Sequence, residues 1–387
     1  MSNRRKTSPE RPTGPRLSPA QRRRARERLL GWYDAAKRAL PWRGEREPYR
    51  IWVSEVMLQQ TRAGTVAPRY ARFLARFPTL TALADAPLEA VLAEWQGLGY
   101  YGRARNLHRA ARAVAGRRGG ELPREREALL KLPGFGPYMA GAVASIAFGE
   151  RAAALDGNGV RVLARLLDLA APADAPSGRA LLEREAAAIV PPSRPGDFNQ
   201  ALMELGARVC LPRRPRCAEC PLGRLCAARA RGTVALRPVK SKKAPPRAAT
   251  LFQFWAERKG RLLLARREED GLFGGLWELP GWMEEGHKEA PRGPALGRRC
   301  RSLLGPGWLP GEELARLVRT LTHRRILFIV LRAHPPLGRR AAPTQEGESA
   351  TWAGPGELAG LPLSSAQRAA IAAARKRLGD RQGNLFG

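Results

Sequence analysis

The strongest constraint on this chain is a group of four cysteines within 17 residues, "CLPRRPRCAECPLGRLC". Cys210, Cys217, Cys220 and Cys226 have the spacing C-x6-C-x2-C-x5-C. Two disulfides are disfavoured, because the spacing is tight and a cytoplasmic chain keeps its thiols reduced. A zinc ribbon normally has two C-x2-C pairs on separate turns, and only one is present here. Four thiolates in a short, loop-rich segment favour an iron–sulfur cluster, with zinc as the alternative.

The charge of the chain predicts a polyanionic partner. Its 387 residues include 68 Lys and Arg against 35 Asp and Glu, a formal net charge of +33. Nucleic acid is the most common partner of such a protein. Five arginines among or beside the cysteines predict a phosphate-binding surface that the cluster supports: Arg208, Arg213, Arg214, Arg216 and Arg224. No apolar run approaches the length of a membrane span and no basic amphipathic anchor stands out, so we expect no membrane partner.

The hydrophobic pattern changes along the chain and predicts two folded domains. Apolar residues recur at three- and four-residue spacing from about residue 29 to 205, which predicts an all-α domain over 29–230 that includes the cysteine segment 210–226. Residues 231–248 are rich in Lys and Pro and predict a linker. Residues 249–376 contain strand-like runs such as "TLFQFWAER", with a turn at Lys259-Gly260, and predict an α/β domain.

The two ends of the chain are predicted to be solvated. Residues 1–28 hold ten basic and two acidic side chains, which predicts a disordered basic arm. Residues 377–387 are expected to form a polar tail. The start of the chain lacks the apolar core of a secretory signal, and Glu10 and Glu27 disfavour a mitochondrial targeting peptide. We therefore expect a cytoplasmic, nucleoid-associated protein. Cys300 stands alone and is expected to be a small core residue.

The stretch "LPGFGPYMAGAVAS", which begins at Leu132, predicts two helices joined by a tight glycine turn. Gly134 and Gly136 free the backbone there, so that successive N–H groups can point outward and bind a phosphate oxygen. Asp156 follows about one helix and a loop later, in "LDGNGVRVLAR". It is either the N-cap of the next helix or a carboxylate held near a sugar of bound DNA.

A second carboxylate, Glu55, lies in "IWVSEVMLQQT". Its helical neighbours three and four positions away are Ile51, Trp52, Leu58 and Gln59. Burial against this apolar stripe would raise the pKa of Glu55 and keep it partly protonated near neutral pH, as a general acid requires. The alternative is a surface glutamate at a helix edge. Two carboxylates in different environments are what cleavage of a glycosidic bond needs, one as an acid and one opposite a cationic sugar.

Several motifs together resemble the MutY-type adenine DNA glycosylases of the helix-hairpin-helix glycosylase superfamily. They are "LPWRGEREPYRIWVSEVMLQQT", "GLGYYGRARNLH", "LPGFGPYMAGAVAS", "LDGN" and the cysteine spacing. The resemblance runs from about residue 29 to 226, and more loosely to about 376. It implies an all-α helix-hairpin-helix glycosylase domain with a 4Fe-4S cluster loop, followed by an α/β Nudix-like lesion-recognition domain. The implied activity is removal of adenine mispaired with 8-oxoguanine or guanine in duplex DNA, by a monomer.

The resemblance also assigns roles to residues near the reaction. Glu55 resembles the acid that protonates the adenine leaving group and handles water. Asp156 resembles the acid that stabilises the cationic sugar, and Asn158 its supporting neighbour. Tyr138 stands where the lyase relatives carry a Schiff-base lysine, which implies a monofunctional glycosylase. With these roles, Asp156 is expected to act on the sugar rather than as a cap.

Other residues match the family's contacts to DNA and to the base. Gln60 and Tyr100 resemble the residues that are wedged into the duplex beside the lesion. Arg43 and Gln200 fall where the family lines its adenine pocket. One alternative is a related endonuclease-type glycosylase-lyase that acts on oxidised pyrimidines. Such an enzyme should carry Lys at position 138, where this chain has Tyr, so we do not expect this activity. A catalytically silent, cluster-bearing DNA-binding protein is the other alternative, and the intact pair of acids argues against it.

The chain departs from the family pattern at two places, and its Nudix-like domain lacks the acidic metal-binding box. Gly159 takes the position of a family Val, so we expect a looser helix start. The family's F-S-H loop, which senses 8-oxoguanine, corresponds to Leu321-Thr322-His323, where Thr322 and His323 keep groups that can form hydrogen bonds. "GLFGGLWELPG" resembles the Nudix-like recognition domain, but "RRCRSLLG" stands where a metal-binding acidic box would be needed. We therefore expect no pyrophosphatase activity.

Overall fold

The computed structural model describes residues 15–117, 120–241, 244–269, 271–321, 323–336 and 349–383. Its contacts separate two compact units. The first unit holds residues 1–85 and 106–243, and the second holds residues 86–105 and 244–387. The first is helical, and the second combines helices with a β-sheet. The predicted fold class, a helical domain followed by an α/β domain, is confirmed.

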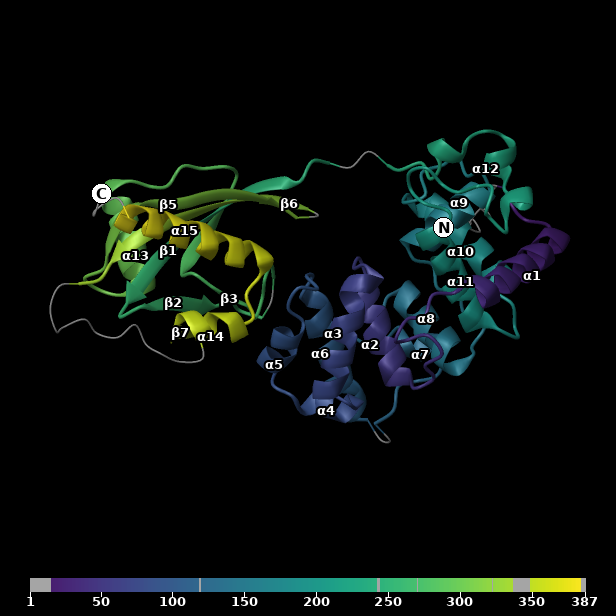
Figure 1. Cartoon of the computed structure of the whole chain (residues 1–387), viewed down its shortest axis with the longest axis horizontal. Helices are drawn as coiled ribbons and strands as arrows, with labels where there is room; N and C mark the ends of the chain where they lie inside the picture. Colours follow the sequence, from purple (N-terminus) through teal and green to yellow (C-terminus); the bar gives the residue numbers. More distant parts are fainter. Residues whose placement is uncertain are drawn as a thin grey trace, which may run out of the picture. The chain divides into compact units, whose positions relative to one another are not determined.

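Helices joined by short loops form the first unit (Figure 1). They are α1 (Pro19–Ala36), α2 (Pro48–Leu58), α3 (Ala63–Arg76), α4 (Leu80–Asp85), most of α6 (Gly102–Ala115), α7 (Arg126–Leu129), α8 (Pro137–Phe148), α9 (Gly157–Leu166), α10 (Pro176–Ile189), α11 (Pro195–Arg208) and α12 (Ala227–Ala230). Several of them have proline at the first or second position. Proline is tolerated there because a backbone N–H in the first turn of a helix would have no partner within the helix.

Helix α1 begins ten residues earlier than the sequence pattern indicated. Ser18 and Gln21 form a capping box at its start, in which each side chain accepts the backbone N–H of the other residue. Ala25, Leu29 and Tyr33 recur at four-residue spacing and are buried. The prediction of a disordered arm over residues 1–28 is therefore wrong from Pro19 onward. The many arginines of this segment lie around a narrow buried stripe, which the count of charges alone does not show.

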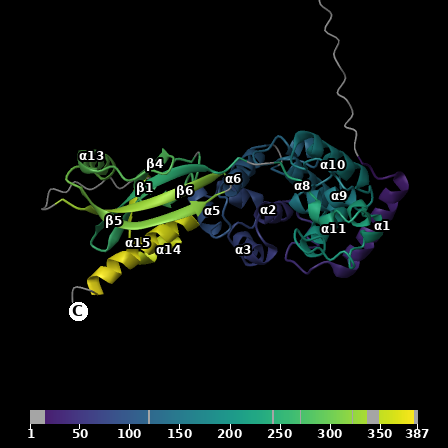
Figure 2. The same ribbon diagram turned by 90° about the horizontal axis from the view of Figure 1, so that it is seen from above.

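One core of the first unit is built by α1, α9, α10 and α11 (Figure 2). Its members are apolar residues of these helices, and three cysteines of the predicted cluster pack against it: Cys210, Cys220 and Cys226. Helices α2, α7 and α8 form the neighbouring part of the unit, where α2 packs on α8. Because α11 contacts both α8 and α9, it joins the two parts.

The predicted linker and tail are both shorter than expected. The backbone N–H of Ala173 donates to the carbonyl oxygen of Val239 at 2.9 Å. The buried Arg165 side chain donates to the carbonyl oxygens of Val234 and Arg237. Residues 231–239 therefore pack on the first unit. At the other end, helix α15 (Ser365–Gly383) continues past residue 377 into the predicted tail.

The second unit is built on a seven-stranded sheet with the order β3-β2-β1-β6-β5, where β4 also pairs with β1 and β7 with β2. The strands are β1 (Arg247–Arg258), β2 (Arg261–Arg266), β3 (Trp277–Glu278), β4 (Gly281–Glu285), β5 (Leu309–Thr320), β6 (Arg324–His334) and β7 (Ala350–Ala353). Strands β1 and β6 pair in parallel, whereas β5 and β6 pair antiparallel. The turn between β1 and β2 lies at Lys259-Gly260, as predicted, and both residues have positive φ.

Helices cover both faces of this sheet (Figure 2). Leu251 and Trp255 of β1 face α15, while Phe252 and Phe254 face α13 (Gly293–Leu304). This alternation buries nearly all of β1, as expected for a central strand covered on both faces. Cys300 of α13 is fully buried in the second of these cores, which confirms its predicted place. The unit also contains α5 (Leu88–Glu94) and α14 (Pro355–Gly360).

Among the residues that the structure describes, no helix is both long enough and apolar enough to cross a membrane.

Candidate active site

Glu55 is a buried carboxylate on helix α2. Glu47 caps the start of this helix by accepting the backbone N–H groups of Tyr49 and Arg50, at 3.0 and 2.7 Å. Glu55 lies two turns later and is 5% exposed, so the alternative of a surface glutamate is wrong. Burial raises its pKa, and the nearby charge of Asp156 adds to this rise. The structure therefore gives Glu55 the environment predicted for a proton donor.

Tyr138 reaches Glu55 from the start of helix α8. Its hydroxyl donates a hydrogen bond to Oε2 of Glu55 at 2.5 Å and lies 3.7 Å from Sδ of Met203. Burial, with Glu55 and Asp156 nearby, raises the pKa of Tyr138 well above its ordinary value, so the hydroxyl remains a donor. The hydrogen bond opposes part of the rise in the pKa of Glu55.

The glycine turn before Tyr138 has the predicted geometry. Gly134 has φ of +78°, and a Cβ there would lie 2.6 Å from Cβ of Asn106. Only glycine suits this position, since the left-handed backbone and the close approach each exclude a side chain. Gly136 is the N-cap of α8, and a Cβ added to it would have no other atom within 4 Å. Helices α7 and α8 thus form the predicted helix–turn–helix, and the contact of its turn with a phosphate stays a prediction.

Asp156 is the N-cap of helix α9. Its Oδ1 accepts the backbone N–H of Gly159 at 2.7 Å, and its Oδ2 accepts the side-chain amide of Asn158 at 2.8 Å. Asp156 therefore caps α9, although we expected it to act on the sugar rather than as a cap. The two roles are compatible, because capping uses one oxygen and leaves the half-buried carboxylate beside Glu55, whose pKa it raises.

Two further contacts fix the start of α9. Nη2 of Arg161 donates to Oδ1 of Asn158 at 2.8 Å, and its Nε donates to the carbonyl oxygen of Cys210 at 2.8 Å. At Gly159 an added Cβ would lie 2.9 Å from Cδ1 of Leu155 and 3.2 Å from Cδ2 of Leu202. The looser helix start expected at Gly159 is not observed, because these leucines fill the space that a larger residue would take.

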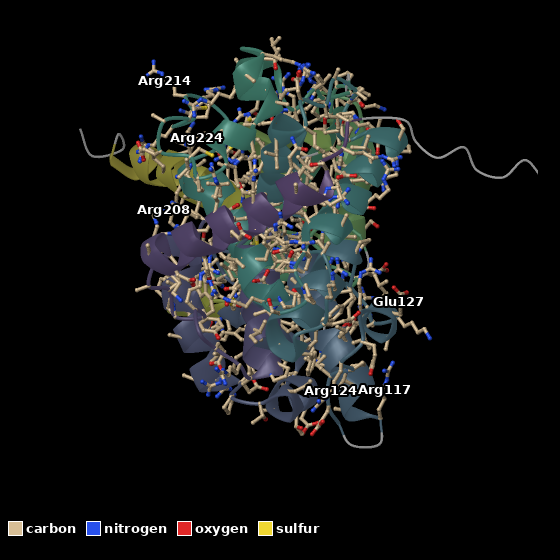
Figure 3. The ribbon with its side chains drawn as sticks, turned by 90° about the vertical axis from the view of Figure 1, so that its right-hand side faces the viewer. Arg117, Arg124, Glu127, Arg208, Arg214 and Arg224 are labelled. Atoms are coloured by element: carbon tan, nitrogen blue, oxygen red, sulfur yellow. The ribbon has the colours of Figure 1, made fainter. Side chains whose placement is uncertain are left out.

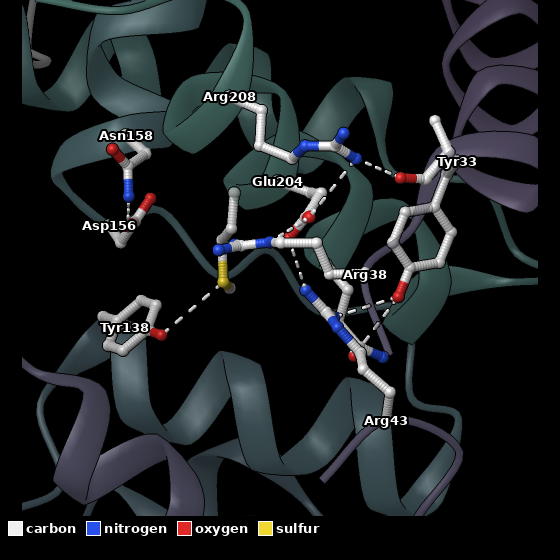
Figure 4. A network of polar contacts seen from close by, with 11 residues as sticks. Tyr33, Arg38, Arg43, Tyr138, Asp156, Asn158, Glu204 and Arg208 are labelled. Carbon is white, nitrogen blue, oxygen red and sulfur yellow. Dashed lines mark hydrogen bonds and ion pairs between the residues drawn. The ribbon is translucent and has the colours of Figure 1, made fainter. Parts of the chain in front are cut away.

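A polar network joins side chains of α1, α11 and the segment between α1 and α2 (Figure 4). Nη1 of Arg43 donates to Oε1 of Gln200 and, at 2.9 Å, to the hydroxyl of Tyr33. Nη2 of Arg43 donates to Oε2 of Glu204 at 3.0 Å. The positive charge of Arg43 lowers the pKa of Glu55 against the effect of burial, so Arg43 acts on the acid electrostatically.

Sequence reasoning found Arg43 and Gln200 but missed two of their partners, Tyr33 and Glu204, and it missed Arg38, which binds Glu204. The one available signal was the spacing of Gln200, Glu204 and Arg208, which places all three on one face of α11. The network borders an open polar hollow, which Tyr33, Arg43 and Gln200 line together with residues from the end of α8 and the start of α11.

The four cysteines of the predicted cluster line one pocket, between α9, the end of α11 and the loop before α12. All are free thiols, and none is fully exposed. Burial raises the pKa of Cys220 to about 11, and the other three thiols add to this rise. Within the described residues no three or more His, Cys, Asp or Glu side chains stand in the arrangement of a metal-ion site. The case that this pocket could hold an iron–sulfur cluster thus rests on the four thiols that line it.

Four arginines within this cysteine segment are exposed, namely Arg213, Arg214, Arg216 and Arg224. Figure 3 shows Arg208, Arg214 and Arg224 at its outer surface, while Arg117 and Arg124 lie at the opposite end of the unit. Arg216 is exposed and is 3.8 Å from the carboxylate of Glu219. The placement agrees with the predicted phosphate-binding surface, whose contact with DNA stays a prediction.

Gln60 and Tyr100, the two predicted wedge residues, share an unusual backbone. Gln60 has φ of +56° and Tyr100 has φ of +47°. Gln60 is exposed in the turn after α2, and 52% of Tyr100 is exposed. Residues other than glycine rarely adopt this conformation, and they do so most often at functional turns. Each residue is thus held in the exposed position that its predicted role requires.

The predicted lesion-sensing loop joins β5 to β6. Leu321 donates its N–H to the carbonyl oxygen of Arg324 at 2.7 Å, which closes the turn. His323 has an exposed side chain, and its carbonyl oxygen accepts the N–H of Arg247 at 3.0 Å. Thr322 lies outside the described residues. The segment "RRCRSLLG" forms the second half of α13 and the glycine after it, with arginines on its exposed side.

Curated proteins named adenine DNA glycosylase are similar to most of this chain. The human protein is 39% identical over 360 residues, which cover 78% of this chain and 65% of that protein. The mouse protein is 37% identical over 360 residues, covering 79% of this chain and 69% of that one. The Schizosaccharomyces pombe protein is 34% identical over 329 residues, covering 70% and 71%.

Two family models match the parts of the chain that carry the site and the sheet. The model of the HhH-GPD superfamily base excision DNA repair protein matches residues 53–186, which include both carboxylates and Tyr138. A NUDIX domain model matches residues 252–373. Fold and site together define a helix-hairpin-helix base excision repair protein with a C-terminal Nudix-type domain. With the relatives above, the chain belongs to the adenine DNA glycosylase family, and it spans about two thirds of the length of the mammalian members.

Proposed function

We propose that this protein hydrolyses the N-glycosidic bond of adenine mispaired with 8-oxoguanine or guanine in duplex DNA, as a monofunctional glycosylase that acts as a monomer. The observation that carries the proposal is the placement of Glu55. A buried carboxylic acid with a raised pKa, hydrogen-bonded by Tyr138 and close to a second carboxylate, is suited to give a proton to a departing base.

The two acids divide the reaction between them. Glu55, whose protonated form burial favours, donates its proton to the adenine ring, and the bond between adenine and the sugar then breaks with the electron pair on the base. Positive charge develops on the sugar, and Asp156 stabilises it electrostatically. Asn158 and the N–H of Gly159 hold the Asp156 carboxylate in one orientation. The deprotonated Glu55 can then accept a proton from the water that adds to the sugar.

The monofunctional assignment rests on Tyr138. A strand-nicking lyase needs a neutral amine to attack the sugar and form a Schiff base. The corresponding position here carries a phenol whose hydroxyl is bound to Glu55. We therefore propose that the product is an intact strand with an abasic site.

The test is a single-turnover assay on duplexes in which adenine lies opposite 8-oxoguanine, guanine or cytosine. Cleavage at the abasic site should appear only after alkali, and most strongly opposite 8-oxoguanine. Strand cleavage without alkali would contradict the monofunctional assignment, and equal rates on all three duplexes would contradict the proposed specificity. No release of adenine from any duplex would overturn the function as a whole.

For the lesion preference we propose that Thr322 and His323 contact 8-oxoguanine. A carbonyl and a ring N–H distinguish this base from guanine, and a hydroxyl or imidazole can bind either. A single such contact gives about 1–3 kcal/mol of discrimination. Replacing both residues by Ala should slow excision opposite 8-oxoguanine and change excision opposite guanine much less, whereas equal slowing would indicate that the loop only supports the fold.

We also propose that Cys210, Cys217, Cys220 and Cys226 hold a 4Fe-4S cluster. Four thiols that share one pocket fit the donor set that such a cluster requires. When bound, the cluster would order the segment 210–226 and its arginines for contact with DNA phosphates. Iron and sulfide near four each per chain are expected in protein purified without oxygen, and zinc in their place would contradict this assignment.

A further inference from the structure

Glu204 is a buried carboxylate with three arginines around it. It lies on α11 and is 1% exposed. Arg38 binds it through Nε and Nη2 at 2.5 and 2.8 Å, Arg43 binds it through Nη2 at 3.0 Å, and Nη1 of Arg208 lies 3.9 Å away. Burial alone would raise the pKa of Glu204, but the bonds and charges of Arg38 and Arg43 outweigh this and lower it. Glu204 is therefore ionised.

Arg43 is held on two sides by this arrangement. One terminal nitrogen binds Glu204, and the other binds the hydroxyl of Tyr33 and the side-chain oxygen of Gln200. The guanidinium also lies 5.4 Å from the centre of the Tyr33 ring. Because a guanidinium is planar, fixed partners on two of its sides restrict it to one orientation. The side chain is 13% exposed, so water competes little for these bonds.

The charge that this network fixes acts on the reacting groups. Arg43 is among the groups that set the pKa of both Glu55 and Tyr138, and it lowers both. Its position therefore affects the proton that the proposed reaction uses, and Arg43 itself belongs to the predicted adenine pocket. A carboxylate that fixes Arg43 would influence excision without touching the base.

Glu185 provides the comparison within the same unit. It is also buried, at 2% exposed, and it also binds an arginine, since Nη2 of Arg22 lies 3.0 and 3.2 Å from its two oxygens. It joins α1 to α10, and in the described part of the chain its hydrogen bonds go to Leu17 and Arg22. Buried ion pairs often serve only to join helices. What distinguishes Glu204 is that one of its arginines, Arg43, also acts electrostatically on Glu55.

We infer that Glu204, held by Arg38, is a positioning residue that fixes the Arg43 guanidinium beside Glu55 for adenine excision. This inference rests on the proposed function. It predicts that Glu204 acts on the reaction only through Arg43.

A double-mutant cycle tests this prediction by single-turnover excision of adenine opposite 8-oxoguanine. Glu204→Gln keeps the shape of the side chain and removes the charge, so Arg43 loses one of its two sides. We expect the rate to fall by about tenfold or more, because small displacements of a positioning group have effects of this size. Arg43→Gln should slow excision at least as much, and the double variant should be no slower than Arg43→Gln alone. Glu185→Gln, the matched control, should stay within about twofold of the unsubstituted protein.

The outcomes separate this inference from the proposed function. Additive slowing in the double variant, or equal rates for Glu204→Gln and Glu185→Gln, would overturn the inference while normal excision by the unsubstituted protein upholds the function. Absence of excision by the unsubstituted protein would overturn both. If Glu204→Gln does not fold, as circular dichroism would show, Arg38→Gln takes its place, since it leaves Glu204 paired with Arg43. It should then slow excision by a smaller factor, also without additivity on Arg43→Gln, and additivity would contradict the inference.

Discussion

Helix α2 and the start of helix α9 each supply one carboxylate, and their surroundings are opposite in kind. Glu55 is buried, at 5% exposed, and accepts a hydrogen bond from the hydroxyl of Tyr138. Asp156 is half-buried at a helix N-terminus, where the N–H of Gly159 and the amide of Asn158 each donate to one oxygen. Burial favours the neutral acid, and a helix N-terminus favours the anion. The two positions thus suit a proton donor and a fixed negative charge.

The most severe test of this contrast removes the proton from Glu55. Glu55→Gln preserves size and cannot protonate the base, so we expect the excision rate to fall by about a thousandfold or more. Affinity for the duplex should be nearly unchanged, because phosphate contacts are made by other residues. Single-turnover kinetics and a binding titration measure the two quantities. A rate within tenfold of the unsubstituted protein would show that Glu55 is not the acid.

Removing the fixed charge should have the next largest effect. Asp156→Asn eliminates the charge opposite the sugar, and we expect excision to slow by about a hundredfold. Asn caps helices as well as Asp does, so the melting temperature should change little. A large loss of stability together with a small loss of rate would show that Asp156 serves α9 and not the reaction.

The pH dependence of excision sharpens the contrast further. The acid must be protonated, so the rate should fall as pH rises through the raised pKa of Glu55. The charge of Asp156 contributes to that rise. In Asp156→Asn the pKa of Glu55 should therefore be lower, and the alkaline fall in rate should begin at lower pH. A pH–rate profile of each protein measures this, and coincident profiles would mean that the two carboxylates do not interact.

The smallest expected effect is on stability. Because the pKa of Glu55 is raised on folding, mainly by burial, its contribution to stability is full below its ordinary pKa of 4.5 and is lost as pH rises through the folded value. Glu55→Gln carries no such penalty at high pH. Its melting temperature should exceed that of the unsubstituted protein by about 2–4 °C at pH 8 and by less at pH 5. A difference that does not depend on pH would contradict a buried, titrating Glu55.

Both carboxylates could be predicted from the sequence because their local patterns are specific. Glu55 stands among apolar residues at helical spacing, and Asp156 follows a glycine turn and precedes a helix. The cysteine spacing likewise predicted residues that the structure places in one pocket. In each case a few neighbouring residues determine the environment. Strand β1 and the turn at Lys259 were predictable for the same reason.

The network of Arg38, Arg43 and Glu204 could not be predicted, because its members come from segments more than 150 residues apart. A glutamate on α11 with arginines nearby looks in sequence like a solvent-exposed helix face. The first part of helix α1 was missed for a related reason, since the arginines of the helix outnumber the three residues of its buried stripe. Only the approach of α1 to α10 and α11 shows that Arg22 pairs with Glu185 and Asp34 with Arg194.

The packing at Gly159 links three positions that are distant in the chain. Leu155 and Leu202 occupy the volume that any side chain at position 159 would need, with approaches of 2.9 and 3.2 Å to its Cβ. The substitution Gly159→Val alone would therefore displace Leu155, which precedes Asp156. The same substitution combined with a smaller residue at position 155 or 202 would leave room for the valine. Substitutions at these sites should be interdependent, so a variant library of this protein needs to vary the three together.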